Sequence, residues 1–151
     1  MQRTALAAVL FAACVGSALA QIAVSEPWVR ATVPQQKATG AFMSLTAAQG
    51  SRLVEARSPV AGVVEIHEMV MENQVMKMRA IPGLDLPPGK AVELKPGGYH
   101  VMLMDLRQQM KDGDTVPITL VVEGKDKKRE TVEVKATVRP LTTSTRDMKK
   151  H

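Results

Sequence analysis

The sequence predicts an all-β domain, and three observations support this fold class. Between residues 131 and 139, Val132, Val134, Ala136 and Val138 alternate with polar residues, which is the period of a half-buried strand. Glycine- and proline-containing turn signals recur at short intervals along the chain. No long segment shows a clean helical period. Many short strands separated by turns predict a sandwich or barrel with Greek-key connections.

The expected strands follow in chain order. Three upstream strands are expected at residues 22–32, 40–46 and 53–58. A hairpin is expected next, with arms at 63–71 and 75–80 around Asn73-Gln74. Downstream of it, the strand candidates are 91–94, 99–106, 116–123 and 131–139, the last two flanking a polar tip at 124–130.

Two segments are expected to lie outside this strand pattern. Residues 105–111 could form a single helical turn. Residues 140–151 are polar and lack periodicity, so we expect a flexible C-terminal tail. The pattern therefore predicts one β-domain at residues 21–139.

Residues 1–20 resemble a cleaved signal peptide. Arg3 provides a positive start, a short apolar run follows, and Ala18-Leu19-Ala20 is a typical cleavage pattern before Gln21. The apolar run is too short to span a bilayer, so stable membrane insertion is not expected. The alternative is a membrane anchor, for example a lipid on Cys14, although Phe11-Ala12-Ala13 fits a lipobox poorly.

Charge and cysteine content exclude several classes of function. The chain has a formal net charge of +5, which becomes +4 when Arg3 leaves with the leader. These charges are spread along the chain and few aromatic residues accompany them, so nucleic-acid binding is not expected. The one cysteine, Cys14, also leaves with the leader. The mature protein therefore has no disulfide and no thiolate nucleophile or ligand.

Histidine and methionine are concentrated in one part of the sequence. His67 and His100 are two of only three histidines, and six of the ten methionines lie between Met69 and Met104. Alternation along a strand places His100, Met102 and Met104 on one face. In the expected hairpin register Met69 faces Met78, so Met78 lies diagonal to His67. His67, Met78, His100 and Met102 could therefore present imidazole and thioether groups to one point.

This set of donors would favour Cu(I). Thioethers are soft, neutral ligands that bind Zn(II), Ca(II) or Mg(II) poorly, and imidazole also suits copper. The alternative for any methionine is that it fills gaps in a core. We expect that role for Met43 and Met110, and it stays open for Met69, Met71, Met76 and Met104.

The spacing of the four candidates reproduces a known motif. The pattern is H-x10-M-x21-H-x-M. It is formed by His67, Met78, His100 and Met102, with ten residues, twenty-one residues and one residue between successive members. The chain thereby resembles the periplasmic copper chaperone family often called PCuAC. Further stretches similar to that family are Pro27-Trp28-Val29-Arg30, Thr39-Gly40-Ala41-Phe42-Met43, Gly89-Lys90 and Lys95-Pro96-Gly97-Gly98-Tyr99-His100.

The resemblance implies a cupredoxin-like Greek-key β-sandwich that is periplasmic and binds one Cu(I) near its surface through the four residues. It also implies delivery toward the copper-site domain of cytochrome c oxidase, the CuA centre, alongside Sco-type proteins. We expect a monomer. Some members of the family carry a His/Met-rich tail with a second copper site. Here the tail offers only Met148 and His151, so that site is not carried over.

Three other functions compete with that of a chaperone. An electron-transfer cupredoxin needs a cysteine thiolate beside two histidines, which the mature chain lacks. An enzyme is not expected, because no Ser/His/Asp or Cys/His set is evident, and Glu65 and Glu68 beside His67 read as solvated strand residues. Copper sequestration for tolerance stays open, since sequence cannot separate storage from delivery.

Overall fold

The computed structural model describes residues 22–140, and these residues form ten β-strands and no helix. The strands are β1 Ile22–Arg30, β2 Ala38–Ala47, β3 Ser51–Arg57, β4 Ala61–Glu72, β5 Val75–Ala80, β6 Leu84–Leu86, β7 Ala91–Leu94, β8 His100–Leu106, β9 Thr115–Gly124 and β10 Arg129–Arg139. The leader expected at 1–20, and the tail beyond Pro140, lie outside the described residues. The all-β prediction is confirmed.

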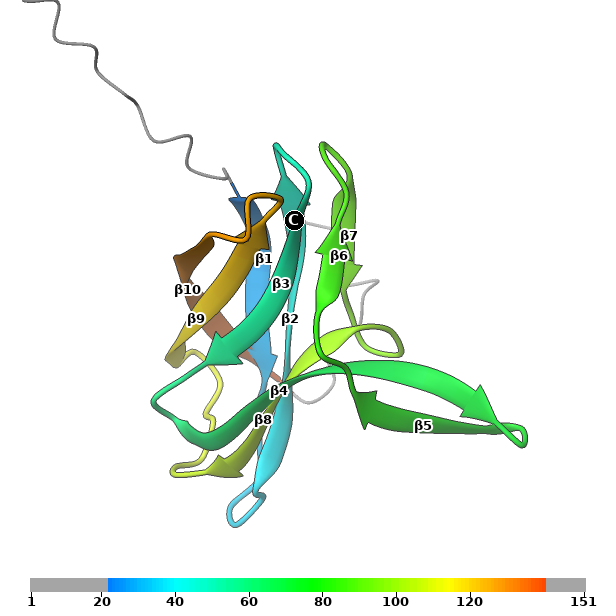
Figure 1. Ribbon diagram of the computed structural model, residues 1–151. Coiled ribbons are helices and arrows are strands. Elements are labelled where there is room, and N and C mark those ends of the chain that lie inside the picture. The colour runs from blue at the N-terminus through cyan, green and yellow to red at the C-terminus, as the bar shows by residue number, and fades with distance from the viewer. Residues whose placement is uncertain (1–21, 141–151) are drawn as a thin grey trace, which may run out of the picture.

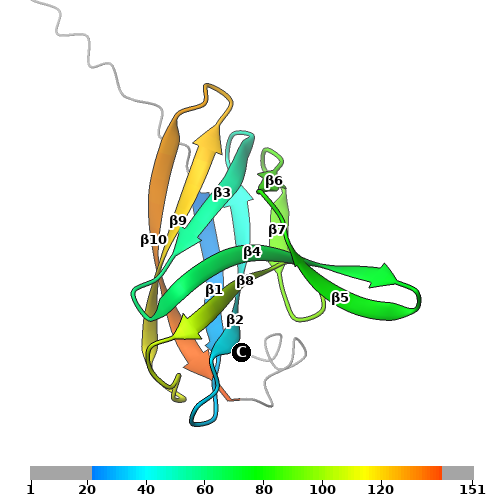
Figure 2. The ribbon, with the colours of Figure 1, turned by 60° about the horizontal axis from the view of Figure 1, so that its bottom comes forward.

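Hydrogen bonds join the strands in the order β5-β4-β8-β2-β1-β10-β9-β3-β6, and β7 also pairs with β2. All pairs are antiparallel except β1 with β10, where Trp28 lies opposite Thr137. The sheet curls, so that β6 at one end of this order contacts β2 near its middle. The result is a cupredoxin-like β-sandwich, from which the β4–β5 hairpin extends outward (Figures 1 and 2).

The core fills the space inside the curled sheet. Strand alternation supplies it: Val101 and Leu103 of β8 are fully buried, opposite Ile66 and Val64 of β4. Other fully buried members are Val29, Leu45, Leu53, Ile118, Leu120, Ala136 and Val138. Because one face of β4 and β8 is used for the core, the other face is left for His67, His100 and Met102.

One expectation from the sequence is wrong, and one short strand was not expected. Residues 105–111 form no helical turn: Asp105 has a φ of 53°, and Leu106 and Arg107 donate backbone hydrogen bonds to the distant carbonyls of Lys37 and Val60. These long-range bonds replace the local ones a helix would need. The short strand β6 was also missed, because Pro82-Gly83 and Pro87-Pro88-Gly89 flank it closely and read as turn punctuation.

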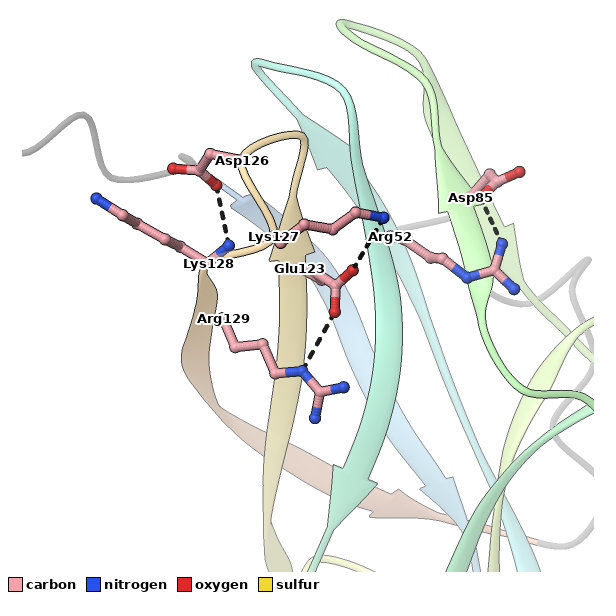
Figure 3. A network of polar contacts seen from close by, with 7 residues as sticks. All are labelled: Arg52, Asp85, Glu123, Asp126, Lys127, Lys128 and Arg129. Atoms are coloured by element: carbon pink, nitrogen blue, oxygen red, sulfur yellow. Dashed lines mark hydrogen bonds and ion pairs between the residues drawn. The ribbon is translucent and has the colours of Figure 1, made fainter.

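The β9–β10 hairpin confirms the expected turn at its polar tip. Lys127 and Arg129 pair with Glu123 at 3.9 and 3.2 Å, and the backbone N–H of Lys128 donates to Asp126 (Figure 3). On the neighbouring β3 and β6, Arg52 pairs with Asp85 at 2.7 Å. Lys127 and Arg129 at this tip are therefore exposed side chains that share one acidic partner. Among the described residues, no helix is long and apolar enough to cross a membrane.

Candidate metal centre

The two histidines singled out from the sequence face each other on adjacent strands. In the antiparallel pairing of β4 with β8, His67 lies directly opposite His100. Their ring centroids are 5.6 Å apart and the rings meet edge-on at 60°. Both residues are buried. The structure therefore brings together two imidazoles that are separated by 32 residues of sequence.

The two methionines of the motif lie on the same face as these imidazoles. Met102 follows His100 by two residues on β8 and is half-buried opposite Glu65 of β4. Met78 of β5 lies opposite Met69, diagonal to His67, and its side chain is 51% exposed. The hairpin register predicted from the sequence is confirmed, with Met71 opposite Met76, Met69 opposite Met78 and His67 opposite Ala80. Three adjacent strands thus place all four candidates on one face. Among them, the rings of His67 and His100 are in contact with each other.

Hydrogen bonds fix the proton on each imidazole. A carboxylate only accepts, so His67 Nε2–H donates to Glu65 Oε2 at 2.7 Å. Likewise His100 Nδ1–H donates to the carbonyl oxygen of Gly98 at 3.1 Å. In the neutral rings the lone pairs are then on His67 Nδ1 and His100 Nε2. His67 Nδ1 is buried and has no hydrogen-bond partner among the described residues. A buried acceptor without a partner is unusual and fits a metal ligand.

Burial favours the form of His100 that can bind metal. Desolvation lowers the pKa of the His100 imidazole, the hydrogen bond to Gly98 partly offsets this shift, and the electrostatic influence of the neighbouring His67 adds a smaller lowering. The neutral imidazole of His100 is therefore the main form at neutral pH. Neutral imidazole is the state that coordinates a metal ion.

Aromatic residues close one side of this face. The Phe42 ring lies 6.2 Å from the His100 ring and 4.6 Å from the ring of Trp28, between centroids. A Cβ on Gly40, which lies opposite Met102, would come within 2.7 Å of the Phe42 ring. Glycine at this position therefore leaves room for the Phe42 ring, which lies beside His100. The guanidinium of Arg30 lies over the Phe42 ring, 5.6 Å from its centroid.

Glu65 is a site residue that the sequence reasoning missed. It was read as a solvated strand residue, but it holds His67 through the hydrogen bond described above. Its spacing of two from His67, which puts both on one face of a strand, was the available signal. Glu68 does point away from the site, where it pairs with Arg79.

The methionines separate into two groups. Met43 and Met110 are buried in the core, as predicted. Met71 and Met76 are exposed and Met69 and Met104 are half-buried, all on the same face as the histidines. Within residues 22–140, no three His, Cys, Asp or Glu side chains gather as a metal site. The soft donor groups that accompany the two imidazoles on this face are therefore thioethers.

These features define a class of protein: a cupredoxin-like β-domain with a histidine–methionine face and no cysteine among the described residues. The sequence matches the family described as "Putative lipoprotein LpqE-like" over residues 22–138, and the chain belongs to this family. A "Putative lipoprotein" of Leifsonia xyli subsp. xyli is 32% identical over 100 residues, which are 66% of this chain and 60% of that protein. The chain thus spans less than two thirds of that relative.

Solved structures of similar fold include two metal-bound domains. The copper-bound PCuAC domain from PmoF2 superposes with a TM-score of 0.64 at 26% identity, covering 79% of this chain and 92% of that one. The Cu(I) form of DR1885 from Deinococcus radiodurans gives a TM-score of 0.57 at 32% identity, covering 82% and 83%. Apo-DR1885 aligns over 95% of this chain and 93% of its own, at 31% identity and a TM-score of 0.60.

Proposed function

We propose that this protein is a copper chaperone that binds one Cu(I) through His67, Met78, His100 and Met102 and passes it to a partner. The observation that carries the proposal is the facing pair of buried histidines, each left with one lone-pair nitrogen beside thioether side chains. Two neutral imidazoles and two neutral thioethers suit a soft monovalent ion. The copper-bound PmoF2 domain and the Cu(I) form of DR1885 support the same choice of metal.

The exposure of Met78 favours transfer over storage. Met78 lies on the edge strand β5 and is half exposed, while His67 and His100 are buried. A ligand from a partner can therefore replace the outer thioether first and take the ion without exposing bare Cu(I) to solvent. We propose the copper-site domain of cytochrome c oxidase, with Sco-type proteins, as the recipient system, and a role that is not enzymatic.

We further propose that the protein acts in the periplasm after cleavage of residues 1–20. The family's description as a lipoprotein supports export and also keeps a lipid on Cys14 as the alternative. The mass of the exported protein separates a chain that begins at Gln21 from a lipidated one.

The decisive experiment combines metal selectivity with transfer. The protein loaded with one equivalent of Cu(I) is mixed with an apo CuA domain, and copper in each protein is measured after separation. We expect most of the copper to move to the CuA domain, and excess Zn(II) to displace none of it beforehand. Displacement by modest zinc would contradict the soft site, and retention of copper against the CuA domain would favour sequestration.

The role of Glu65 gives a second prediction. Glu65→Leu removes the acceptor that orients His67, so the Cu(I) affinity should fall by roughly 10–100-fold, as is usual when a hydrogen-bond partner of a metal ligand is lost. Glu65→Gln keeps an oxygen acceptor and should retain most of the affinity. Competition with a Cu(I) chelator measures both variants.

The matched control is Glu68→Leu, on the opposite face of the same strand, which should leave the Cu(I) affinity unchanged. Equal losses in Glu65→Leu and Glu68→Leu would show that the effect is general to β4 and not a property of the His67 hydrogen bond.

A further inference from the structure

The outer part of the β4–β5 hairpin carries methionines that lie outside the hydrophobic core. Met71 is 67% exposed and Met76 is 47% exposed, whereas the core takes its methionines from Met43 and Met110. Both views show this hairpin extending away from the sandwich (Figures 1 and 2). Exposed thioethers here cannot be explained as gap filling, which is the usual use of methionine.

The two faces of the hairpin differ in chemistry. On one face, Arg79 pairs with Glu68 and Lys77 with Glu72. On the other face the cross-strand pairs are Met71 with Met76 and Met69 with Met78, followed by His67 with Ala80. Thioethers therefore form a continuous row from the tip of the hairpin to the histidines, while the charged side chains are kept on the reverse side.

The turn fixes the outermost pair. Asn73 and Gln74 have φ values of 50° and 65°, as a two-residue hairpin turn of the I′ type requires. Glu72 then pairs with Val75, and Met71 with Met76. Directly opposed side chains have Cβ atoms about 4.5–5.5 Å apart, so both sulfur atoms can reach one ion. A slip of one residue would send the two thioethers to opposite faces.

We propose that Met71 and Met76 form a second, weaker Cu(I) site at the hairpin tip, from which the ion moves through Met69 and Met78 to His67 and His100. That the ion ends at His67 and His100 rests on the proposed function of the protein. Successive pairs on this face are about 7 Å apart along the strand, a step that long methionine side chains can bridge. The copper stays Cu(I) throughout, because each step only exchanges one neutral ligand, a thioether or an imidazole, for another.

The test is a titration of the mature protein, labelled with ¹³C at the methionine methyl groups, with Cu(I) under anaerobic conditions. The first equivalent should shift the ring signals of His67 and His100, and the second should shift the methyl signals of Met71 and Met76. The double variant Met71→Leu/Met76→Leu keeps the apolar surface but removes both sulfur atoms. It should lose the second event, keep the first, and take up Cu(I) from a chelator several-fold more slowly.

Lys77→Ala, on the charged face of the same hairpin, is the matched control and should keep both events. No methyl shift at Met71 and Met76 with the second equivalent, or a second event that persists in the double variant, would overturn the tip site while leaving the histidine site intact. A first equivalent that leaves both histidines unshifted would instead overturn the proposed function.

Discussion

Met78→Ala is expected to lower the affinity for Cu(I) by at least about 100-fold, more than the loss of an outer hydrogen-bond partner costs. The free energy of unfolding of the apo protein should change by less than about 1 kcal/mol, since substitutions at exposed positions are usually nearly neutral. The physical reason is that Met78 is half exposed on an edge strand, outside the core, and its proposed role is that of a sulfur ligand. Chelator competition and denaturant melts of the apo protein measure the two quantities.

The matched control is Met76→Ala, two residues away on the same strand and face and almost equally exposed. It should leave the tight Cu(I) site unchanged. If both variants lost the same affinity, Met78 would not be a specific ligand. If Met78→Ala strongly destabilised the apo protein, the side chain would be acting as core.

Met110→Ala is expected to show the reverse behaviour. Met110 is 1% exposed within the core, so its truncation should lower the free energy of unfolding by about 2–5 kcal/mol. Its backbone N–H still donates to Thr32 Oγ1, which keeps the loss confined to side-chain packing. The folded variant should bind Cu(I) as tightly as the parent protein, because Met110 lies away from the face that carries His67 and His100.

Met110→Leu separates packing from chemistry at this position. Leucine nearly conserves the buried volume, so the cost should be below about 1.5 kcal/mol. Equilibrium unfolding in urea measures both variants. A mild Met110→Ala together with weaker copper binding would contradict the assignment of Met110 to the core.

The sequence alone determined the local elements. Alternating valines placed β10, and Asn73-Gln74 set both the turn and the register of the β4–β5 hairpin, because a two-residue turn leaves only one pairing. The same register placed Met69 opposite Met78 and Met71 opposite Met76. Strand alternation also put His100 and Met102 on one face. The choice of His67, Met78, His100 and Met102 as copper ligands came from the motif spacing and stays a prediction.

Only the tertiary structure decided the contacts between distant segments. Whether β4 pairs with β8, and in which register, depends on how the core faces of both strands are buried together, so the meeting of His67 with His100 is not encoded by either segment alone. The tertiary structure also buries His67 while leaving Glu65 42% exposed, so that the carboxylate can accept the His67 hydrogen bond from the solvent side. Long-range backbone hydrogen bonds likewise override the local helical preference near Asp105. Local patterns fix strands and turns, whereas burial against distant strands fixes which side chains share a site.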